Sequence, residues 1–316
     1  MTDHLLSGLA ADNLLAYLAA LGTLRTATLA RPDDELRLSW EPHDGRWHPR
    51  LHGVLAGDQS EFVALLDRQL QASADLPALN LADDLTLQVE EFRAALQQAQ
   101  QATTPQDRRN ADFLTAMGSD VIQSRQNGKP TGRIADTALR TMSGAGHQHF
   151  LSTIRTFIAD TTPEHLTKSL FEEWRYDDPL ENHSLRWDPA DDIRYALRWD
   201  NPSGDRNRKT SGSMWGANRL AIEALPLFPV QPIGDRVATT GFSEAPRSAT
   251  ELTWPVWSTP TGLAEVRSLL TIPTLRAIIP DHDQLAPRGI VAVYRCQRIT
   301  RDKYRNFTPA RPIGAK

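Results

Sequence analysis

The stretch DNLLAYLAALGTLRTATLA, residues 12–30, is typical of a helix. Its large apolar side chains recur at i, i+3 and i+4 spacing, which predicts a helix with one apolar stripe. These side chains are Leu14, Leu15, Tyr17, Leu18, Leu21 and Leu24. Asp12 or Asn13 can cap the N-terminus. Gly22 lies inside the pattern, where glycine costs about 1 kcal/mol relative to alanine unless another element packs closely against it.

Working outward from this helix, the sequence predicts a pair of strands followed by several helices. ELRLSWEP and RWHPRLHGVL (35–42 and 46–55) read as strands around a turn at His43-Asp44-Gly45. The expected helices cover residues 60–71, 88–101, 111–122, 147–159 and 163–175. The polar, proline-bearing segment 102–110 is the expected internal boundary, which gives an acidic region 1–105 and a second region 106–316.

The C-terminal part has a different character. A helix is expected from near Ala217 to Pro226, and prolines concentrated over 226–260 predict loops and short strands. The β-branched segment 288–300 predicts a strand. The expected fold class is therefore α+β, with an N-terminal helix and strand pair, a helical middle and a strand-and-loop-rich C-terminal region.

Composition narrows the class of protein. Of the 316 residues, 40% are hydrophobic and 23% are charged, as in soluble globular proteins. No apolar run approaches the roughly 18 residues that a membrane helix needs. Asp3 and His4 occupy the place where a secretory signal has Lys or Arg, so we expect a cytoplasmic protein without a membrane partner. The single cysteine, Cys296, excludes an internal disulfide and is expected to be a strand thiol.

Charge is distributed unevenly along the chain. Residues 1–100 contain 7 Lys and Arg against 15 Asp and Glu, whereas residues 286–316 contain 8 against 1. An acidic front and a basic end are typical of a part fitted into a larger assembly, and equally of a solvated C-terminal extension.

Motifs for common catalytic sites are absent from the sequence. It has no complete G-x-x-x-x-G-K-[ST], no G-x-G-x-x-G after a strand, no G-x-S-x-G and no H-E-x-x-H. Weak candidates for metal binding are His43-Asp44, His147-x-His149, Asp177-Asp178 and Asp281-His282-Asp283. Each also has an ordinary explanation as a turn or an exposed loop. We therefore expect no cofactor and no catalytic residue, while a metal-dependent nuclease remains the alternative.

Positive charge and aromatic rings gather between residues 184 and 219, where Arg-Trp-Asp occurs twice, at 186–188 and 198–200. Arginine and lysine neutralise phosphates, and aromatic faces stack on unpaired bases. The candidate nucleic-acid contacts are Arg186, Arg194, Arg198, Trp199, Arg206, Arg208, Lys209 and Arg219. The alternative for the two tryptophans is burial in the core, with Arg and Asp bridging at its rim.

The C-terminal segment repeats this combination of cations and aromatic rings. Its candidate contacts are Arg298, Arg301, Lys303 and Arg305, interleaved with Tyr294, Tyr304 and Phe307. Phosphate binding is one explanation, and protection of a basic edge strand against edge-to-edge pairing is the other.

Two segments resemble a known family. GLAADNLLAYLAALGTLR (8–25) resembles the N-terminal signature of subunits from CRISPR type I-G (formerly I-U) systems. SLRWDPADDIRYALRWDNPS (184–203) and WGANRLAIEALPLFP (215–229) resemble a block in the same proteins, with weaker likeness over 143–155. The resemblance covers about a fifth of the chain and contains no catalytic fingerprint.

The resemblance implies a large-subunit-like or accessory component of a CRISPR effector complex, although 316 residues is short for a full large subunit. Such a component contacts crRNA, target DNA or sister subunits, while a separate helicase–nuclease cleaves. We therefore expect a non-catalytic, nucleic-acid-binding subunit. A metal-dependent nuclease and a purely protein-binding scaffold are the alternatives.

Overall fold

The centre of the molecule is the helix α1 (Leu14–Ala30). The computed structural model describes residues 2–54, 57–142, 149–179, 183–190, 212–244, 250–301 and 304–314. The Asn13 side chain caps α1 by accepting a hydrogen bond from the Ala16 amide at 3.2 Å, as predicted. Every residue from Leu14 to Ala27 is buried, so α1 is covered on all sides and not along one stripe. A helix with this burial lies inside a large core.

Helix α8 (Trp215–Ile222) packs closely against α1 at Gly22. A Cβ atom at Gly22 would lie 1.7 Å from the carbonyl oxygen of Leu220. Only glycine therefore permits this approach between the two helices, which explains a glycine within a helical pattern. The expected helix after Ala217 is confirmed, with its start two residues earlier.

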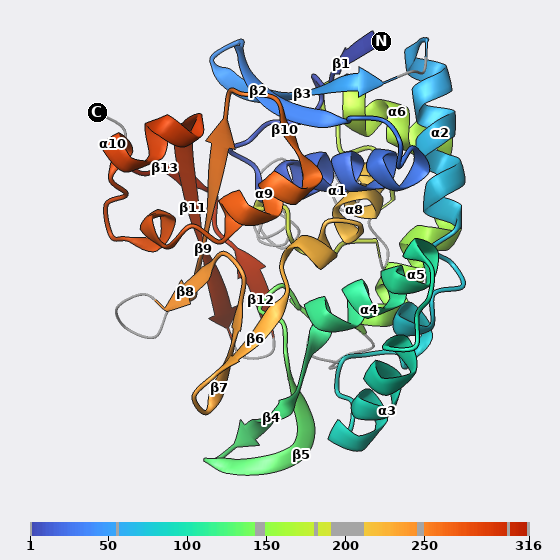
Figure 1. Ribbon diagram of the computed structural model, residues 1–316, viewed down its shortest axis with the longest axis vertical. Helices are drawn as coiled ribbons and strands as arrows, with labels where there is room; N and C mark the ends of the chain where they lie inside the picture. Colours follow the sequence, from blue (N-terminus) through green and yellow to red (C-terminus); the bar gives the residue numbers. More distant parts are fainter. Residues whose placement is uncertain are drawn as a thin grey trace, which may run out of the picture.

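An antiparallel sheet covers one side of α1 (Figure 1). Its order is β1 (Thr2–Leu5), β3 (Arg46–Val54), β2 (Arg37–His43) and β10 (Thr261–Gly262). The predicted turn is confirmed, because Asp44 and Gly45 adopt φ angles of 49° and 77°, which a type I′ hairpin turn requires. Strand β1 was not predicted from the sequence. Trp40 on β2 stacks on Tyr17 of α1 with 5.4 Å between ring centroids.

The helical middle contains α2 (Gln59–Gln71), α3 (Val89–Ala99), α4 (Pro105–Met117), α5 (Phe150–Asp160) and α6 (Pro163–Phe171). The helix predicted at 111–122 is confirmed over 111–117, but α4 begins earlier, at Pro105, within the polar segment 102–110, and residues 118–122 belong to a strand. Thr104 caps α4 by accepting from the Asp107 amide at 3.1 Å, and proline occupies the first helical position. Both are helix start signals, and they place the helix earlier than its apolar residues do.

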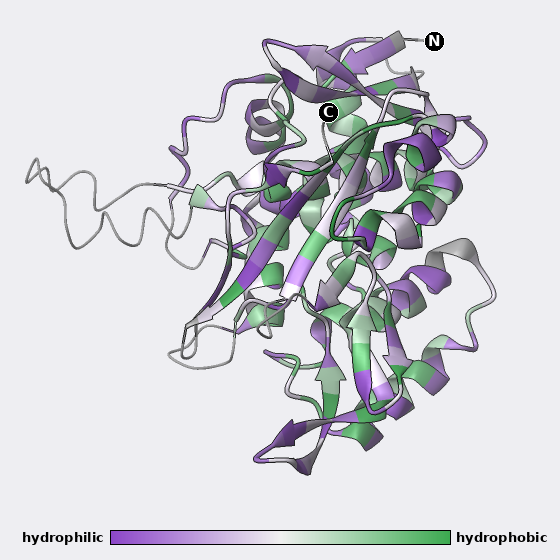
Figure 2. Ribbon diagram, turned by 90° about the vertical axis from the view of Figure 1, so that its left-hand side faces the viewer, coloured by the Kyte–Doolittle hydropathy of each residue, from purple (hydrophilic) through white to green (hydrophobic). Residues whose placement is uncertain are grey.

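Two β-hairpins form two-stranded sheets of their own. β4 (Gly118–Gln126) and β5 (Lys129–Asp136) form a ribbon that projects from the body, with Asn127 and Gly128 at φ angles of 51° and 77° in its turn (Figure 1). Its tip is strongly hydrophilic (Figure 2). The second hairpin, β6 (Val230–Ile233) and β7 (Arg236–Thr239), packs against β4.

A second sheet forms the C-terminal region. Its strands are β8 (Phe242–Glu244), β9 (Thr250–Trp257), β11 (Ile290–Arg301) and β12 (Tyr304–Phe307), in the order β12-β11-β9-β8, and β13 (Arg311–Pro312) also pairs with β11. Helices α9 (Leu263–Leu270) and α10 (His282–Leu285) lie between β9 and β11 in sequence. The strand predicted at 288–300 is confirmed, and Cys296 is a buried thiol on it.

The α+β prediction, with a strand-rich C-terminal region, is confirmed. One hydrophobic cluster includes Leu6, Leu114 and Phe307, so sequence on both sides of the predicted boundary near residue 105 shares a core. Across the part of the chain that the structure describes, no helix is long and apolar enough to cross a membrane.

Candidate anion-binding site

The first Arg-Trp-Asp motif lies in the interior. Trp187 has no exposed surface, its indole Nε1 donates to the Leu139 carbonyl at 2.9 Å, and its ring meets Phe150 edge-on. The core interpretation is confirmed for this tryptophan. Arg186, a candidate nucleic-acid contact, is next to this buried tryptophan in the chain and is itself only 4% exposed. Arg194, Arg198, Trp199, Arg206, Arg208 and Lys209 lie outside the described residues and stay predictions.

Arg219, another candidate contact, is also buried. Its Nη1 pairs with Glu223 Oε1 at 3.2 Å, one turn later on the same stretch, and its Nη2 donates to the Leu70 carbonyl at 2.6 Å. The guanidinium is 2% exposed and therefore stabilises the interior instead of meeting a ligand at the surface. The i, i+4 spacing of arginine and glutamate was a signal for this pairing.

Glu223 is surrounded by cations. Arg25 Nη1 lies 2.7 Å from its carboxylate and Arg109 Nη2 lies 3.6 Å away, while the Ser73 hydroxyl donates at 2.6 Å. Burial alone would raise the pKa of Glu223, but the three guanidinium groups, with Arg219 the strongest, lower it to about 2. Glu223 is therefore a carboxylate at any physiological pH.

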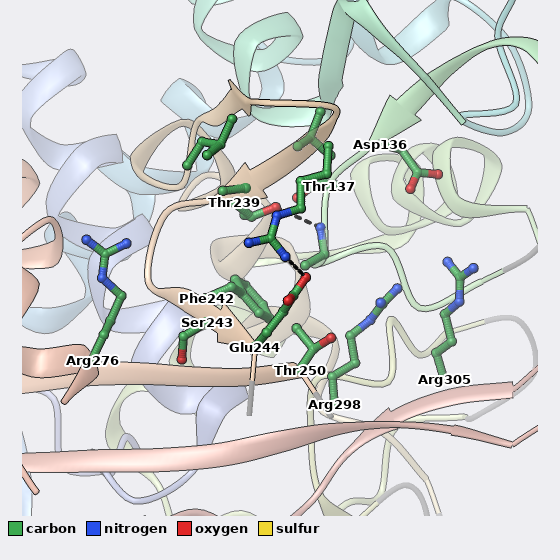
Figure 3. Close-up of a pocket in the computed structure, with 15 residues that line it drawn as sticks. Asp136, Thr137, Thr239, Phe242, Ser243, Glu244, Thr250, Arg276, Arg298 and Arg305 are labelled. Carbon is green, nitrogen blue, oxygen red and sulfur yellow. Dashed lines mark hydrogen bonds and ion pairs between the residues drawn. The ribbon is translucent and has the colours of Figure 1, made fainter. Parts of the chain in front are cut away.

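A pocket of about 540 Å³ opens between the β6–β7 hairpin and the C-terminal sheet. It is lined by four arginines, Arg236, Arg276, Arg298 and Arg305, and we call it the arginine pocket. Figure 3 shows Arg298 and Arg305 extending from the C-terminal strands into the same space, with Arg276 at its other end.

The carboxylates of the arginine pocket are already engaged. Arg236 forms an ion pair with Glu244 (Figure 3). Asp136 forms an ion pair with Arg140, which does not line the pocket. For Arg276, Arg298 and Arg305, no carboxylate among the described residues lies within ion-pair distance. The pocket therefore presents an excess of positive charge.

Arg298 is the most constrained of these cations. Its Nη2 donates to the Arg140 carbonyl at 2.8 Å, whereas its Nε is buried and has no hydrogen-bond partner among the described atoms. Burial, and then the neighbouring charge of Arg305, lower the pKa of Arg298 to about 10. The group stays charged at neutral pH. The Asp136 carboxylate opposes this shift only in part, and an oxyanion in the pocket would supply the missing acceptor and a further counter-charge.

The structure thus brings together two predicted contacts, Arg298 and Arg305. Arg301 pairs through its backbone with Tyr304 at the end of β11, and Lys303 lies outside the described residues. Sequence reasoning missed Arg236 and Arg276. Each is an isolated cation in the sequence, Arg236 beside an aspartate and Arg276 among apolar residues, and only the tertiary fold brings them to the C-terminal strands.

The weak candidates for metal binding lie on different elements of the fold. His43 and Asp44 are exposed in their turn, 3.2 Å apart, and Asp281 caps α10. Asp178 accepts from the Trp215 amide at 2.9 Å, and His149 precedes α5. Within the described ranges no group of three or more His, Cys, Asp or Glu could hold a metal ion. His147 falls outside those ranges.

No protein-family model matches the chain, and no curated protein is significantly similar to it.

Proposed function

We propose that this chain is a non-catalytic, nucleic-acid-binding subunit of a CRISPR type I RNA-guided effector complex, in which the arginine pocket holds a phosphate of the bound strand. The observation that carries the binding part is the excess of cations around one pocket. Arg276, Arg298 and Arg305 have no carboxylate partner in the described part of the chain, and Arg298 retains an unmet buried donor.

A phosphate group suits these cations. Its oxygens accept paired N–H donors from guanidinium groups, and charge-assisted hydrogen bonds of this kind are about twice as strong as neutral ones. Each phosphate neutralised also releases condensed counterions, which favours binding at low salt. A nucleic acid carries a phosphate at every nucleotide, so other cations on β11 and β12 would contact phosphates next to the one in the pocket.

Membership of a CRISPR complex rests on the resemblance of residues 8–25, 184–203 and 215–229. In the fold, the first and last of these segments supply α1 and α8, which pack on each other at Gly22. A shared sequence signature at such a contact would preserve the core of the fold, with surface residues left to determine the ligand. The crRNA, the target DNA and sister subunits are the proposed partners.

Co-purification tests the assignment to a complex. The chain, expressed with the backbone and nuclease genes and the repeat array of its own genome, is expected to elute with crRNA and sister subunits in one particle. Nuclease treatment then separates the alternatives, because a scaffold that contacts protein alone would remain bound after the RNA is destroyed. Elution as a free monomer without nucleic acid would contradict the proposal.

A further inference from the structure

The outer face of the N-terminal sheet carries a chain of three polar side chains from three strands. Ser39 on β2 lies with its Oγ 2.8 Å from His52 Nε2 on β3. His52 Nδ1 lies 2.9 Å from Asp3 Oδ2 on β1. This order of hydroxyl, imidazole and carboxylate is the arrangement in which a serine acts as a nucleophile. None of these three residues lines the arginine pocket.

The Asp3 carboxylate determines which nitrogen of the neutral His52 ring carries the proton. Burial raises the pKa of Asp3, but hydrogen bonds from His52 and from the Gly53 amide outweigh it, and the pKa is lowered overall. An ionised carboxylate only accepts, so His52 Nδ1 must carry the proton. In the neutral ring, Nε2 is then the acceptor, and the Ser39 hydroxyl is its donor. The Gly53 amide, 3.3 Å from Asp3 Oδ1, holds the carboxylate in place.

Neighbouring side chains cover the Ser39 hydroxyl in this structure, so an ester reaches it only when they move aside. Arg50 is the cross-strand partner of Ser39, so its side chain lies on the same face, where its Nε donates to Glu41 at 2.7 Å. Ser39 itself is 2% exposed, whereas the His52 and Arg50 side chains are 20% and 28% exposed. The neighbouring side chains are long, and exposed rotamers change within nanoseconds.

We propose that this chain, which under the function proposed above leaves nucleic-acid cleavage to other subunits, carries a separate acyl-transfer site for small carboxylic esters. Ser39, His52 and Asp3 form this site on the outer face of the sheet. Ser39 Oγ bonds to the ester carbonyl carbon as its proton passes to His52 Nε2, and that proton then leaves with the alkoxide as the ester C–O bond breaks. Water next attacks the acyl-serine, His52 takes the water proton and returns it to Oγ, and the carboxylic acid departs.

A fluorophosphonate reagent tests the nucleophile directly, because a serine oxygen displaces its fluoride and forms a stable P–O bond. The full-length chain is treated and digested, and the modified serine is identified by mass spectrometry. Ser268, exposed on α9 with its hydroxyl on a backbone carbonyl, is the internal control. Ser39 is expected to be labelled at least 100-fold faster than Ser268, since a positioned base contributes about 10²–10⁴-fold. Equal labelling of the two serines would overturn the proposal.

Two variants separate activation from exposure. His52→Gln is expected to lower the labelling rate of Ser39 about 100-fold, and unchanged labelling in a variant with wild-type circular dichroism would overturn the proposal. Asp3 is a positioning residue, so Asp3→Asn is read by the ¹⁵N shifts of His52. Loss of the proton from Nδ1, together with at least tenfold slower labelling, is expected. A shift pattern and a rate equal to wild type would contradict the assigned role.

Discussion

Replacing the buried carboxylate of Glu223 tests how much its ion pairs with three arginines contribute to the free energy of unfolding. Glu223→Gln keeps the shape of the side chain and removes the charge that faces Arg25, Arg109 and Arg219. Lowering the pKa of Glu223 from 4.5 to about 2 corresponds to about 3 kcal/mol of stability at neutral pH. Breaking a buried ion pair by removing one partner costs about 3–5 kcal/mol, which agrees with that figure.

The pH dependence follows from the lowered pKa. The folded pKa lies below the unfolded one, so the contribution is complete above about pH 4.5 and is lost as the pH falls through about 2. Between pH 6 and pH 3, the wild-type chain should lose about 2 kcal/mol through this group. Glu223→Gln should lose none of that portion.

Urea unfolding followed by circular dichroism measures both effects, with the stability change read from the midpoint at constant slope. Glu164→Gln is the matched control, because Glu164 forms an i, i+4 pair with Lys168 at 3.3 Å but is 76% exposed. It should cost no more than about 0.5 kcal/mol. If Glu223→Gln unfolds at the same urea concentration as this control, the account of the buried cluster is refuted.

Three further predictions concern other parts of the chain. Replacing Arg206, Arg208 and Lys209 with alanine should weaken nucleic-acid binding and flatten its salt dependence without changing the melting temperature, and an unchanged affinity would count against this segment. Gly22→Ala should lower the melting temperature although alanine favours helices, because its Cβ would meet the Leu220 carbonyl; a stabilised variant would refute the close packing of α1 and α8. The purified chain should not cut DNA or RNA in magnesium or manganese, and cleavage that co-purifies with it through several columns would revive the nuclease alternative.

Local signals in the sequence predicted much of the fold. The apolar repeat of α1 with its Asn13 cap, the turn at Asp44 and the β-branched run of β11 each depend on neighbours in sequence. The start of α4 was predicted too late, because its first turn is polar and only the proline and the capping box at Thr104 mark it as helical. Strand β1 has only four residues, and its pairing with β3 is a long-range contact that no local pattern encodes.

The candidate site was less accessible to sequence reasoning. Counting cations identified Arg298 and Arg305, but it also selected Arg186 and Arg219, which the fold places in the interior. The difference lies in the partners. Glu223 sits one turn after Arg219 and pairs with it, whereas the carboxylate near Arg298, Asp136, forms its ion pair with Arg140. A cation is available to a ligand only when the tertiary structure leaves its charge uncompensated.

The salt dependence of nucleic-acid binding tests whether the arginine pocket holds a phosphate. Fluorescence anisotropy with labelled single strands of about 20 nucleotides, in DNA and RNA form, gives the affinity between about 50 and 200 mM salt. The double variant Arg298→Gln and Arg305→Gln should bind at least tenfold more weakly. Its slope of log affinity against log salt should fall by about 1.4, because each lost single-strand phosphate contact removes about 0.7.

Arg31→Gln is the control, since this exposed arginine lies at the end of α1 and does not line the pocket. It should leave both the affinity and the slope close to wild type. If the double variant binds with the affinity and the slope of the wild-type chain, the arginine pocket does not hold a phosphate.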